Sequence, residues 1–384
     1  MTPTPSQPQY RAAEFFAGIG LVGEALGAEG VEVVYANDID PVKERLFVAN
    51  YDTSVFHRGD IREIAGREIP DIDVATASFP CTDVSLAGNR AGLDGEQSGM
   101  FWEFARILQE MGERRPRAIL LENVVGFCSS NGGEDLRAAF GRLNGLGYFC
   151  DLVYADARWF VPQSRPRLFI VGSLSPLDSS VATATIGSEV RPPWFAAFAA
   201  RHSDLKLQAM ALTPPASAGQ SLDAVVERVP ADDERWWDRQ RTEAFLLSLS
   251  DVNAARLKRL KASEALTWRT AYRRTRHGRP VWEIREDQIS GCLRTARGGS
   301  SKQAVVETGG GQVRVRWMTA REYARLQGVP NFNFSGVSES QAMFGFGDAV
   351  CVPVVRWIIS SYVLPLLDGS VLESAEPLVR VAGL

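Results

Sequence analysis

Two short segments of this sequence contain residue types that can do covalent or acid-base chemistry. Pro80-Cys81 follows an apolar run and precedes a polar, glycine-containing stretch over residues 85–99. A cysteine thiolate is a strong nucleophile, and such a stretch is typical of a mobile active-site loop, whereas the usual place of a cysteine is a core. Glu122 ends another apolar run, where a carboxylate is costly unless it has a partner or a function. We therefore treat Cys81 and Glu122 as candidate functional residues.

A third segment, Gln163-Ser164-Arg165-Pro166-Arg167, precedes a further apolar run. Arginines held beside a buried strand are fixed hydrogen-bond donors, which suits them to a phosphate group or to the carbonyl of a base. A surface salt bridge is the ordinary alternative for either arginine.

Glycines and acidic residues in the first sixty positions indicate a nucleotide site. Phe15-Phe16-Ala17-Gly18-Ile19-Gly20 lies between an expected strand and an expected helix, where glycines let the backbone approach a ligand. Asp38 ends the next expected strand, where a carboxylate accepts hydrogen bonds from ribose hydroxyls, and Asp60 follows a third strand, where it can bind the exocyclic amine of an adenine. These residues predict an adenosine-containing cofactor and leave open whether it is a dinucleotide or a methyl donor.

The elements that must position these residues are visible as apolar patterns. Residues 12–16 and 31–36 are short strand candidates. Continuous apolar runs, which are typical of strands buried on both faces of a parallel sheet, occur at residues 74–77, 119–121 and 168–171. Apolar residues repeat at helical spacing over residues 21–26, 100–111 and 136–143. The alternation predicts an α/β fold with a doubly wound sheet, whose strands carry the candidate residues at their carboxyl ends.

The same patterns suggest how the chain divides. After residue 173 the rhythm gives way to Ser, Ala, Pro and polar residues, and it returns near residue 316. We therefore expect one domain made of residues 11–172 and 316–384, a smaller irregular domain over residues 173–315, and a disordered start over residues 1–10. Thr319-Ala320-Arg321-Glu322 has the form of a capping box, which predicts a helix that Gly328 and Pro330 end.

Composition narrows the class of protein. The 384 residues are 45% hydrophobic and 23% charged, which excludes a disordered, collagenous or coiled-coil chain. The five cysteines form no Cys-x-x-Cys pair, so a disulfide framework and a zinc site are not expected. No apolar run approaches the roughly 20 residues that span a bilayer, and the first ten residues do not resemble a signal peptide. We expect a cytoplasmic protein with reduced thiols and no bound metal.

Charge is distributed unevenly along the chain. The net charge of −4 gives no reason to expect a nucleic-acid partner. Residues 256–279, however, hold nine basic residues and only one acidic residue, with Trp268 and Tyr272 between them. This run is either a phosphate-binding surface or a solvated helical face.

Taken in order, the motifs resemble those of the DNA cytosine-5 methyltransferases of prokaryotic restriction-modification systems. The resemblance covers residues 11–360 apart from 173–285, and it includes Phe-x-Gly-x-Gly, an acidic residue, Pro-Cys, Glu-Asn-Val, Gln-x-Arg-x-Arg, residues 316–330 and Gly347-Asp348-Ala349-Val350. It implies a Rossmann-like methyltransferase fold that uses S-adenosyl-L-methionine, with residues 173–315 as a target-recognition domain for double-stranded DNA.

The resemblance also implies roles for individual residues. Cys81 would attack carbon 6 of a cytosine flipped out of the duplex, Glu122 would protonate ring nitrogen 3, and Arg167 would donate to the base carbonyl. Arg165 would orient Glu122 or the cysteine loop. The expected cofactor-binding residues are Phe16, Ala17, Gly18, Gly20, Asp38, Ile39, Asp60, Ile61, Pro80, Asp348 and Ala349. The expected DNA-binding residues are Gln163, Arg273, Arg274, Arg276, Arg294, Arg297 and Ser300.

The chain departs from the family pattern at two positions. Thr82 stands where the family commonly has Gln, and Asp348 stands where it commonly has Asn in the Gly-Asn-x-Val segment. A carboxylate at position 348 either touches the methionine end of the donor or caps a turn through nearby backbone groups, and the sequence leaves both open.

Three other functions fit parts of the sequence. A tRNA cytosine-5 methyltransferase shares the fold but usually carries a Cys-Phe-Thr triplet that this chain lacks. A catalytically silent DNA-binding regulator would have lost the nucleophile, whereas Cys81 is present. A dinucleotide-dependent oxidoreductase leaves Pro80-Cys81 and Glu122-Asn123-Val124 without a role. We expect a monomeric enzyme, with a restriction endonuclease as its partner in the cell and no membrane association.

Overall fold

The chain folds into two compact units. The computed structural model describes residues 9–80, 93, 99–178, 188–216, 219–276, 278–295 and 302–371. Unit 1 consists of Met1–Asp156, Pro166–Pro214 and Val354–Leu384, and unit 2 consists of Ala157–Arg165 and Pro215–Pro353. These boundaries differ from those suggested by the sequence, because residues 173–214 belong to unit 1 and residues 316–353 belong to unit 2. The assignment of residues 173–315 to target recognition stays a prediction.

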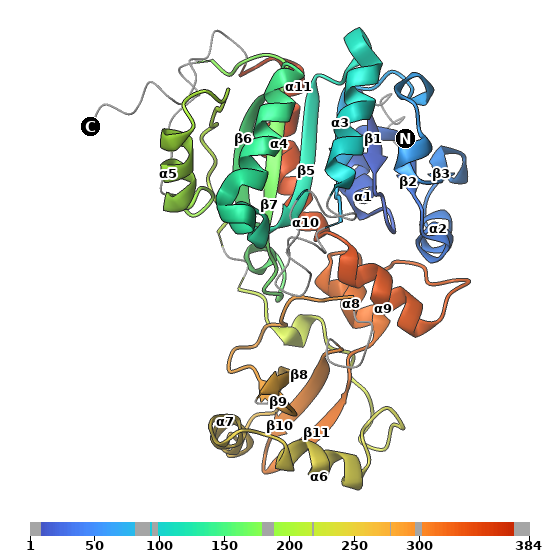
Figure 1. Ribbon diagram of the computed structural model, residues 1–384. Coiled ribbons are helices and arrows are strands. Elements are labelled where there is room, and N and C mark those ends of the chain that lie inside the picture. Colours follow the sequence, from blue (N-terminus) through green and yellow to red (C-terminus); the bar gives the residue numbers. More distant parts are fainter. Residues whose placement is uncertain are drawn as a thin grey trace, which may run out of the picture. The chain divides into compact units, whose positions relative to one another are not determined.

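Unit 1 is built on a seven-stranded sheet with the order β3-β2-β1-β4-β5-β7-β6 (Figure 1). Neighbours among β1 to β5 pair in parallel, whereas β7 is antiparallel to both β5 and β6. The α/β class is confirmed, and the carboxyl ends of the five parallel strands lie at one edge. The strands are β1 (Tyr10–Phe15), β2 (Val31–Asp38), β3 (Phe56–Arg58), β4 (Val74–Ala77), β5 (Ala118–Val124), β6 (Phe149–Asp156) and β7 (Pro166–Ser173).

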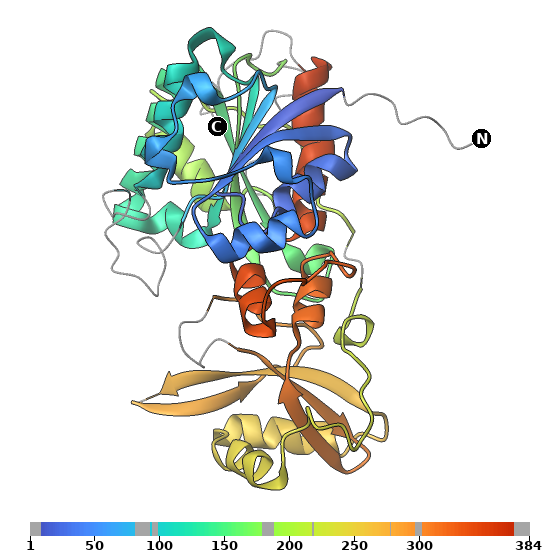
Figure 2. The same ribbon diagram turned by 90° about the vertical axis from the view of Figure 1, so that its right-hand side faces the viewer.

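Helices cover both faces of this sheet. In Figure 2, α3 (Met100–Met111) and α4 (Glu134–Gly145) lie on one face, and the stretch from α10 (Val352–Ile358) to α11 (Leu364–Asp368) lies on the other. Helix α3 buries Phe101, Phe104 and Ile107 in the main core, as its helical spacing predicts. The remaining helices of unit 1 are α1 (Leu21–Ala28), α2 (Pro41–Val48) and α5 (Pro193–Arg201).

Strand β6 was not predicted from the sequence, and a buried ion pair explains why. Asp151 interrupts the apolar run of this strand, yet it is fully buried, because it forms an ion pair with Arg191 and accepts a hydrogen bond of 2.8 Å from the Tyr362 hydroxyl. A charged residue in a strand can be buried only with such partners, and these partners lie far away in the sequence.

One helical stretch is longer and more apolar than the sequence analysis allowed. Glu339–Asp368 has a mean hydropathy of 1.8 over an 18-residue window, which is enough by length and composition to cross a membrane. The expectation that no run approaches this size was therefore wrong. The same window is 61% buried inside the protein, and the backbone of Ala349 leaves the helix at ψ 158°, so the stretch is a set of core helices.

Unit 2 contains a four-stranded antiparallel sheet with the order β11-β10-β8-β9. Its strands are β8 (Thr267–Arg276), β9 (Arg279–Ile284), β10 (Ala304–Gly309) and β11 (Gln312–Trp317). Its helices are α6 (Arg239–Leu247), α7 (Asp251–Lys261), α8 (Ala320–Leu326) and α9 (Glu339–Asp348). The expected capping box is confirmed, because the Thr319 side chain accepts a hydrogen bond from the Glu322 backbone N–H at the start of α8.

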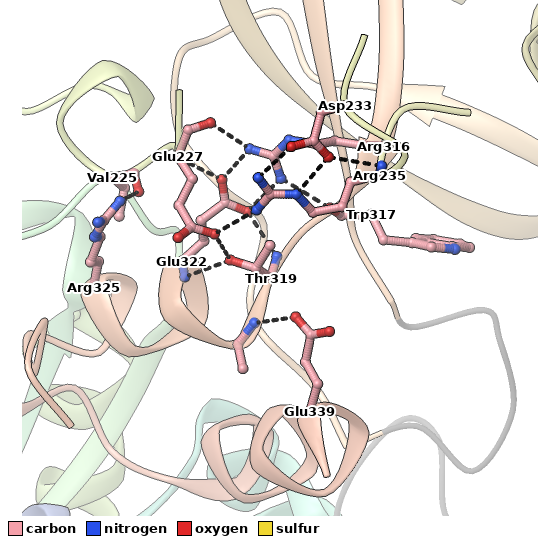
Figure 3. Close-up of polar contacts among 11 residues, drawn as sticks. Val225, Glu227, Asp233, Arg235, Arg316, Trp317, Thr319, Glu322, Arg325 and Glu339 are labelled. Atoms are coloured by element: carbon pink, nitrogen blue, oxygen red, sulfur yellow. Dashed lines mark hydrogen bonds and ion pairs between the residues drawn. The ribbon is translucent and has the colours of Figure 1, made fainter. Parts of the chain in front are cut away.

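A buried ion pair joins β11 to α8. Arg316 and Glu322 are almost completely buried and form two hydrogen bonds with each other, and the Glu322 carboxylate also accepts the backbone N–H groups of Glu227 and Thr319 at 2.8 Å (Figure 3). Thr319 in turn donates to the Glu227 carboxylate at 2.6 Å. These contacts hold residues 316–322 against the segment before the sheet, which explains why this stretch belongs to unit 2.

Candidate active site

The turn between β1 and α1 has the backbone of a ligand-binding loop. Phe16, Gly18 and Gly20 all have positive φ, at 56°, 58° and 85°. A side chain at Gly20 would also collide with Tyr51, since its Cβ would lie 2.5 Å from the ring. The backbone N–H of Ala17 donates to the carbonyl of Asn37 at 2.8 Å, which ties the turn to the end of β2. The strain at Phe16 is of the kind found at ligand-binding sites.

Asp38 organises this turn from the end of β2. Its Oδ2 accepts the backbone N–H of Gly18 at 2.8 Å and its Oδ1 accepts that of Asp40 at 2.9 Å. A carboxylate has about four acceptor positions, so two remain for ribose hydroxyls. Ile39 is 62% exposed beside it, and it offers an apolar surface to a flat ring.

Asp60 follows β3, as expected, but it already has a partner. Arg62 donates to both of its carboxylate oxygens from Nε at 3.0 Å, and this hydrogen bonding lowers the pKa of Asp60. Asp60 therefore stays an acceptor, as an adenine amine requires. The side chain of Ile61 is buried in the main core, so only its backbone is available to a ligand.

Glu14 lies beneath the turn and was not among the predicted site residues. It is 1% exposed on β1, and its Oε2 accepts the backbone N–H of Gly23 in the first turn of α1 at 3.0 Å. Burial raises the pKa of Glu14 to about 8. A carboxyl group thus occupies the helix N-terminus that would otherwise bind a pyrophosphate. A charged residue inside an apolar strand was the available signal, because the same reasoning identified Glu122.

Glu122 and Arg167 form an ion pair across β5 and β7. Arg167 Nε lies 2.7 Å from Glu122 Oε1, and the two side chains are 15% and 12% exposed. Because Val124 of β5 lies opposite Arg167, Glu122 and Arg167 are diagonal neighbours on one face of the sheet. The expected proximity of these two residues is observed.

The adjacent strand β4 leads to the predicted nucleophile. The Asn123 side-chain amide donates to the Phe79 carbonyl at 3.3 Å, and its oxygen accepts the N–H of Val124 at 2.8 Å. Asn123 thereby holds the chain just before the partly buried Pro80. Cys81 and Thr82 lie outside the described residues. Burial raises the pKa of Cys128 and Cys150 far above the usual range, which makes these two thiols inert.

Arg165 and Gln163 have other surroundings than the sequence suggested. Arg165 is 2% exposed and donates to the carbonyls of Leu293 at 2.9 Å and Ala349 at 2.6 Å, all within unit 2. Gln163 is fully buried and donates to the Leu326 carbonyl at 2.8 Å. The role of Gln163 in DNA binding stays a prediction, and the Arg165 guanidinium donates to backbone carbonyls of unit 2.

Asp348 and Ala349 lie at the end of α9, where that cluster holds their backbone. Arg165 donates to the carbonyl of Asp348 at 3.4 Å as well as to that of Ala349, and Gln327 also donates to the Ala349 carbonyl, at 3.0 Å. The Asp348 side chain is exposed. The backbone of exposed Arg294 passes close by, because a Cβ at Gly347 would lie 2.5 Å from its carbonyl carbon.

Three of the predicted DNA-binding arginines lie on β8, where Arg273 is on one face and Arg274 and Arg276 are on the other, as the pairing with β9 shows. Arg297 and Ser300 lie outside the described residues. Among the residues that the structure describes, no group of three or more His, Cys, Asp or Glu side chains could hold a metal ion.

Comparison with known proteins shows that the chain is similar to members of one family. Residues 10–363 match the family model described as C-5 cytosine-specific DNA methylase. The chain is 28% identical over 375 residues to the type II methyltransferase M1.ScrFI of Lactococcus lactis subsp. cremoris, covering 94% of this chain and 80% of that protein. It is 30% identical over 355 residues to the type II methyltransferase M.NlaX of Neisseria lactamica, covering 91% and 95%.

Solved structures share the fold. The S. pombe Dnmt2 methyltransferase matches with a TM-score of 0.61 and 19% identity, over 93% of this chain and 99% of that one. An E. coli structure of a putative DNA modification methyltransferase encoded within a prophage matches with a TM-score of 0.53 and 17% identity, over 94% and 100%. Because the sequence identities are 19% and 17%, these two matches show that the fold is similar and carry no argument about function.

Proposed function

Because the chain belongs to the C-5 cytosine-specific DNA methylase family, and is thus a DNA cytosine-5 methyltransferase, we propose that it methylates a flipped-out cytosine within a specific duplex sequence, with Cys81 as nucleophile. One observation carries the proposal. Glu122 and Arg167 form a half-buried ion pair at the strand end next to the one that leads to Pro80-Cys81. A thiol, a carboxyl group and a guanidinium are the groups that activation of a cytosine ring requires.

The residues act on different atoms of the base. Carbon 5 of cytosine becomes nucleophilic only after a thiolate adds to carbon 6, and Cys81 supplies that thiolate. The electron pair released by this addition is stabilised when Glu122 protonates nitrogen 3, and Arg167 donates to the base carbonyl. After the methyl group is in place, the carbon 5 proton is lost to solvent, Cys81 leaves as the thiolate, the double bond is restored and the nitrogen 3 proton returns to Glu122.

S-adenosyl-L-methionine fits the loop at the ends of β1, β2 and β3. When bound, it supplies an electrophilic methyl group. Asp38 has acceptor positions left for the ribose, Ile39 offers an exposed apolar surface, and Asp60 remains a carboxylate for the adenine amine. A dinucleotide is disfavoured at the same loop, because Glu14 already accepts the Gly23 N–H that a pyrophosphate would use.

The substrate proposed is double-stranded DNA. The target atom is inaccessible in a stacked duplex, so the base must be flipped out at a cost of a few kcal/mol. The similar proteins are named type II methyltransferases. We infer that this enzyme likewise acts beside a restriction endonuclease that cuts the same sequence when it is unmethylated.

Two measurements test the proposal. Expression in a methylation-free host, followed by bisulfite sequencing of host DNA, should reveal methylated cytosines in one sequence context. Duplex carrying 5-fluorocytosine in that context should form a denaturation-resistant adduct with the wild type and none with Cys81→Ala. Methylation of tRNA with unmodified host DNA would instead support an RNA methyltransferase, and an equal adduct with Cys81→Ala would exclude Cys81 as the nucleophile.

A further inference from the structure

The sheet of unit 2 ends in a projecting two-stranded ribbon. Strand β8 pairs with β10 through residues 267–271 and with β9 through residues 271–276. Beyond Ala271, β8 therefore has only β9 beside it among the described strands. Residues 272–276 and 279–283 form this ribbon, which Figure 2 shows projecting to one side of the sheet.

The two faces of the ribbon differ. Residues directly opposite each other on antiparallel strands share a face, and the faces alternate along each strand. Arg273 and Trp282 share one face, whose base is covered by Phe245 of α6 and Leu257 of α7. The second face, which we call the arginine face, carries Tyr272, Arg274, Arg276, Arg279, Val281 and Glu283.

A single glutamate orients two arginines on the arginine face. Arg276 donates to Glu283 Oε1 from Nε at 2.9 Å and from Nη2 at 2.6 Å, and Arg274 Nε lies 3.8 Å from Glu283 Oε2. The Arg274 guanidinium also lies 5.1 Å from the centre of the Tyr272 ring. Glu283 is 19% exposed, whereas Arg274 and Arg276 are 44% and 61% exposed. The guanidinium groups are thus restrained and still accessible.

We propose that the arginine face reads bases in the major groove and that Arg276, oriented by Glu283, recognises a guanine. This proposal rests on the proposed function, which makes duplex DNA the substrate. A two-stranded ribbon fits the major groove, and a guanidinium that donates to O6 and N7 of guanine is the commonest specific contact there. The ribbon thus supplies a specificity determinant that the sequence analysis could not assign.

Glu283 is what distinguishes base reading from phosphate binding. A carboxylate beside two arginines cancels part of their positive charge and repels phosphate, so it weakens an electrostatic backbone contact. It benefits a base contact, because an arginine fork that is already held in place loses less conformational entropy when it binds. The three arginines and one glutamate of the arginine face retain enough positive charge to approach DNA.

The test compares an arginine of the ribbon with a matched arginine elsewhere. Arg276→Lys keeps the charge and removes the planar fork. Arg259→Lys is the control, because Arg259 on α7 is 65% exposed and also pairs with a glutamate, Glu286, at 3.2 Å. Catalytically inactive Cys81→Ala versions of the full chain select duplexes from a random pool. The background protein should enrich a guanine that Arg276→Lys no longer enriches and that Arg259→Lys retains.

A second measurement identifies the contacted atom. Each guanine of the selected sequence is replaced in turn by 7-deazaguanine, which lacks the N7 acceptor. At one position, which is not the guanine paired with the target cytosine, 7-deazaguanine should lower the affinity of the protein with Arg276 by about 10-fold or more. The Arg276→Lys variant should bind the guanine and 7-deazaguanine duplexes equally well at that position. Glu283→Gln should reduce discrimination at that same position.

The outcomes separate this proposal from the proposed function. Identical selected sequences for Arg276→Lys and its parent would overturn base reading, and a salt slope reduced by about one in Arg276→Ala would then mark a phosphate contact. If guanine selection depends on Arg276 but the wild type methylates no DNA, base reading stands and the proposed function is wrong.

Discussion

Each unit of the molecule contains a glutamate–arginine pair, and the two pairs differ in what remains for a ligand. In unit 2, Arg316 and Glu322 are 0% and 1% exposed, and backbone N–H groups of Glu227 and Thr319 also bond the Glu322 carboxylate. In unit 1, Arg167 and Glu122 are 15% and 12% exposed at a strand end. A glutamate and an arginine therefore form a structural ion pair in unit 2 and a candidate reaction site in unit 1.

The difference shows that the surroundings of a carboxylate, more than its partner, determine its role. A buried pair with further backbone bonds cannot change partner without a large cost in free energy. A pair at the edge of a sheet can exchange a hydrogen bond for one to a substrate. Matched substitutions in the two pairs should accordingly have opposite effects on stability and turnover.

The largest expected effect is the loss of stability in Glu322→Gln. Removing this charge leaves Arg316 buried without its counterion, which should lower the free energy of unfolding by about 3–5 kcal/mol. Urea denaturation followed by tryptophan fluorescence measures it, because Trp282 is buried in the core of unit 2 and Trp237 and Trp317 pack against that core. A loss comparable to that of an exposed pair, about 1 kcal/mol or less, would contradict a structural role.

Glu122→Gln should show the reverse. The amide cannot protonate nitrogen 3, so turnover should fall by roughly 10²-fold or more, while DNA affinity and the free energy of unfolding stay close to wild type. Single-turnover kinetics with the bisulfite-identified site measure the chemical step. If the variant keeps more than about a tenth of the rate, Glu122 has a structural role like that of Glu322.

Much of the fold could be predicted because unit 1 follows simple periodicity. The observed bounds of β4 and α3 coincide with the apolar patterns at residues 74–77 and 100–111. The antiparallel direction of β7 and the existence of β6 could not be predicted, since both depend on long-range pairing and on the buried partners of Asp151. The ribbon in the irregular region could not be predicted either. From the sequence alone its arginines could equally belong to a solvated helical face, because the strand pairing that decides which side chains share a face is unknown.

The candidate site was predictable where a residue type ends a strand. Glu122 and Arg167 were singled out because each lies next to a strongly apolar run, and these runs are strands β5 and β7; the ion pair between the two residues was not predicted. Arg165 lies only two residues away, but the chain changes units at that point and its side chain binds carbonyls of unit 2. Sequence spacing does not reveal such a change of unit, so the surroundings of Gln163 and Arg165 could not be predicted.

Glu14 is an intermediate case between the two pairs, since it is buried and its bonds are to backbone N–H groups. Its pKa, raised by burial from 4.5 to about 8, means that the folded state binds more protons than the unfolded state between these values. Stability should therefore fall as pH rises through that window. Between pH 5 and pH 7 the free energy of unfolding should decrease by about 2 kcal/mol more in the wild type than in Glu14→Gln. Urea denaturation at both pH values measures this difference. Equal pH dependence in both proteins would show that Glu14 is not the titrating group.

Asp348 extends the comparison to an exposed carboxylate, and it carries the smallest expected effect. It ends α9, where a negative charge opposes the helix dipole at a cost of about 0.3–1 kcal/mol. The donor's sulphonium and ammonium groups are cations, which a carboxylate near the methionine end of the donor would attract. We therefore expect Asp348→Asn to stabilise the protein slightly and to change the Michaelis constant for S-adenosylmethionine by several-fold, with DNA affinity unchanged. Thermal unfolding and initial rates at varied donor concentration measure both effects. A variant with lower thermal stability and unaltered donor kinetics would show that the carboxylate only caps the local backbone.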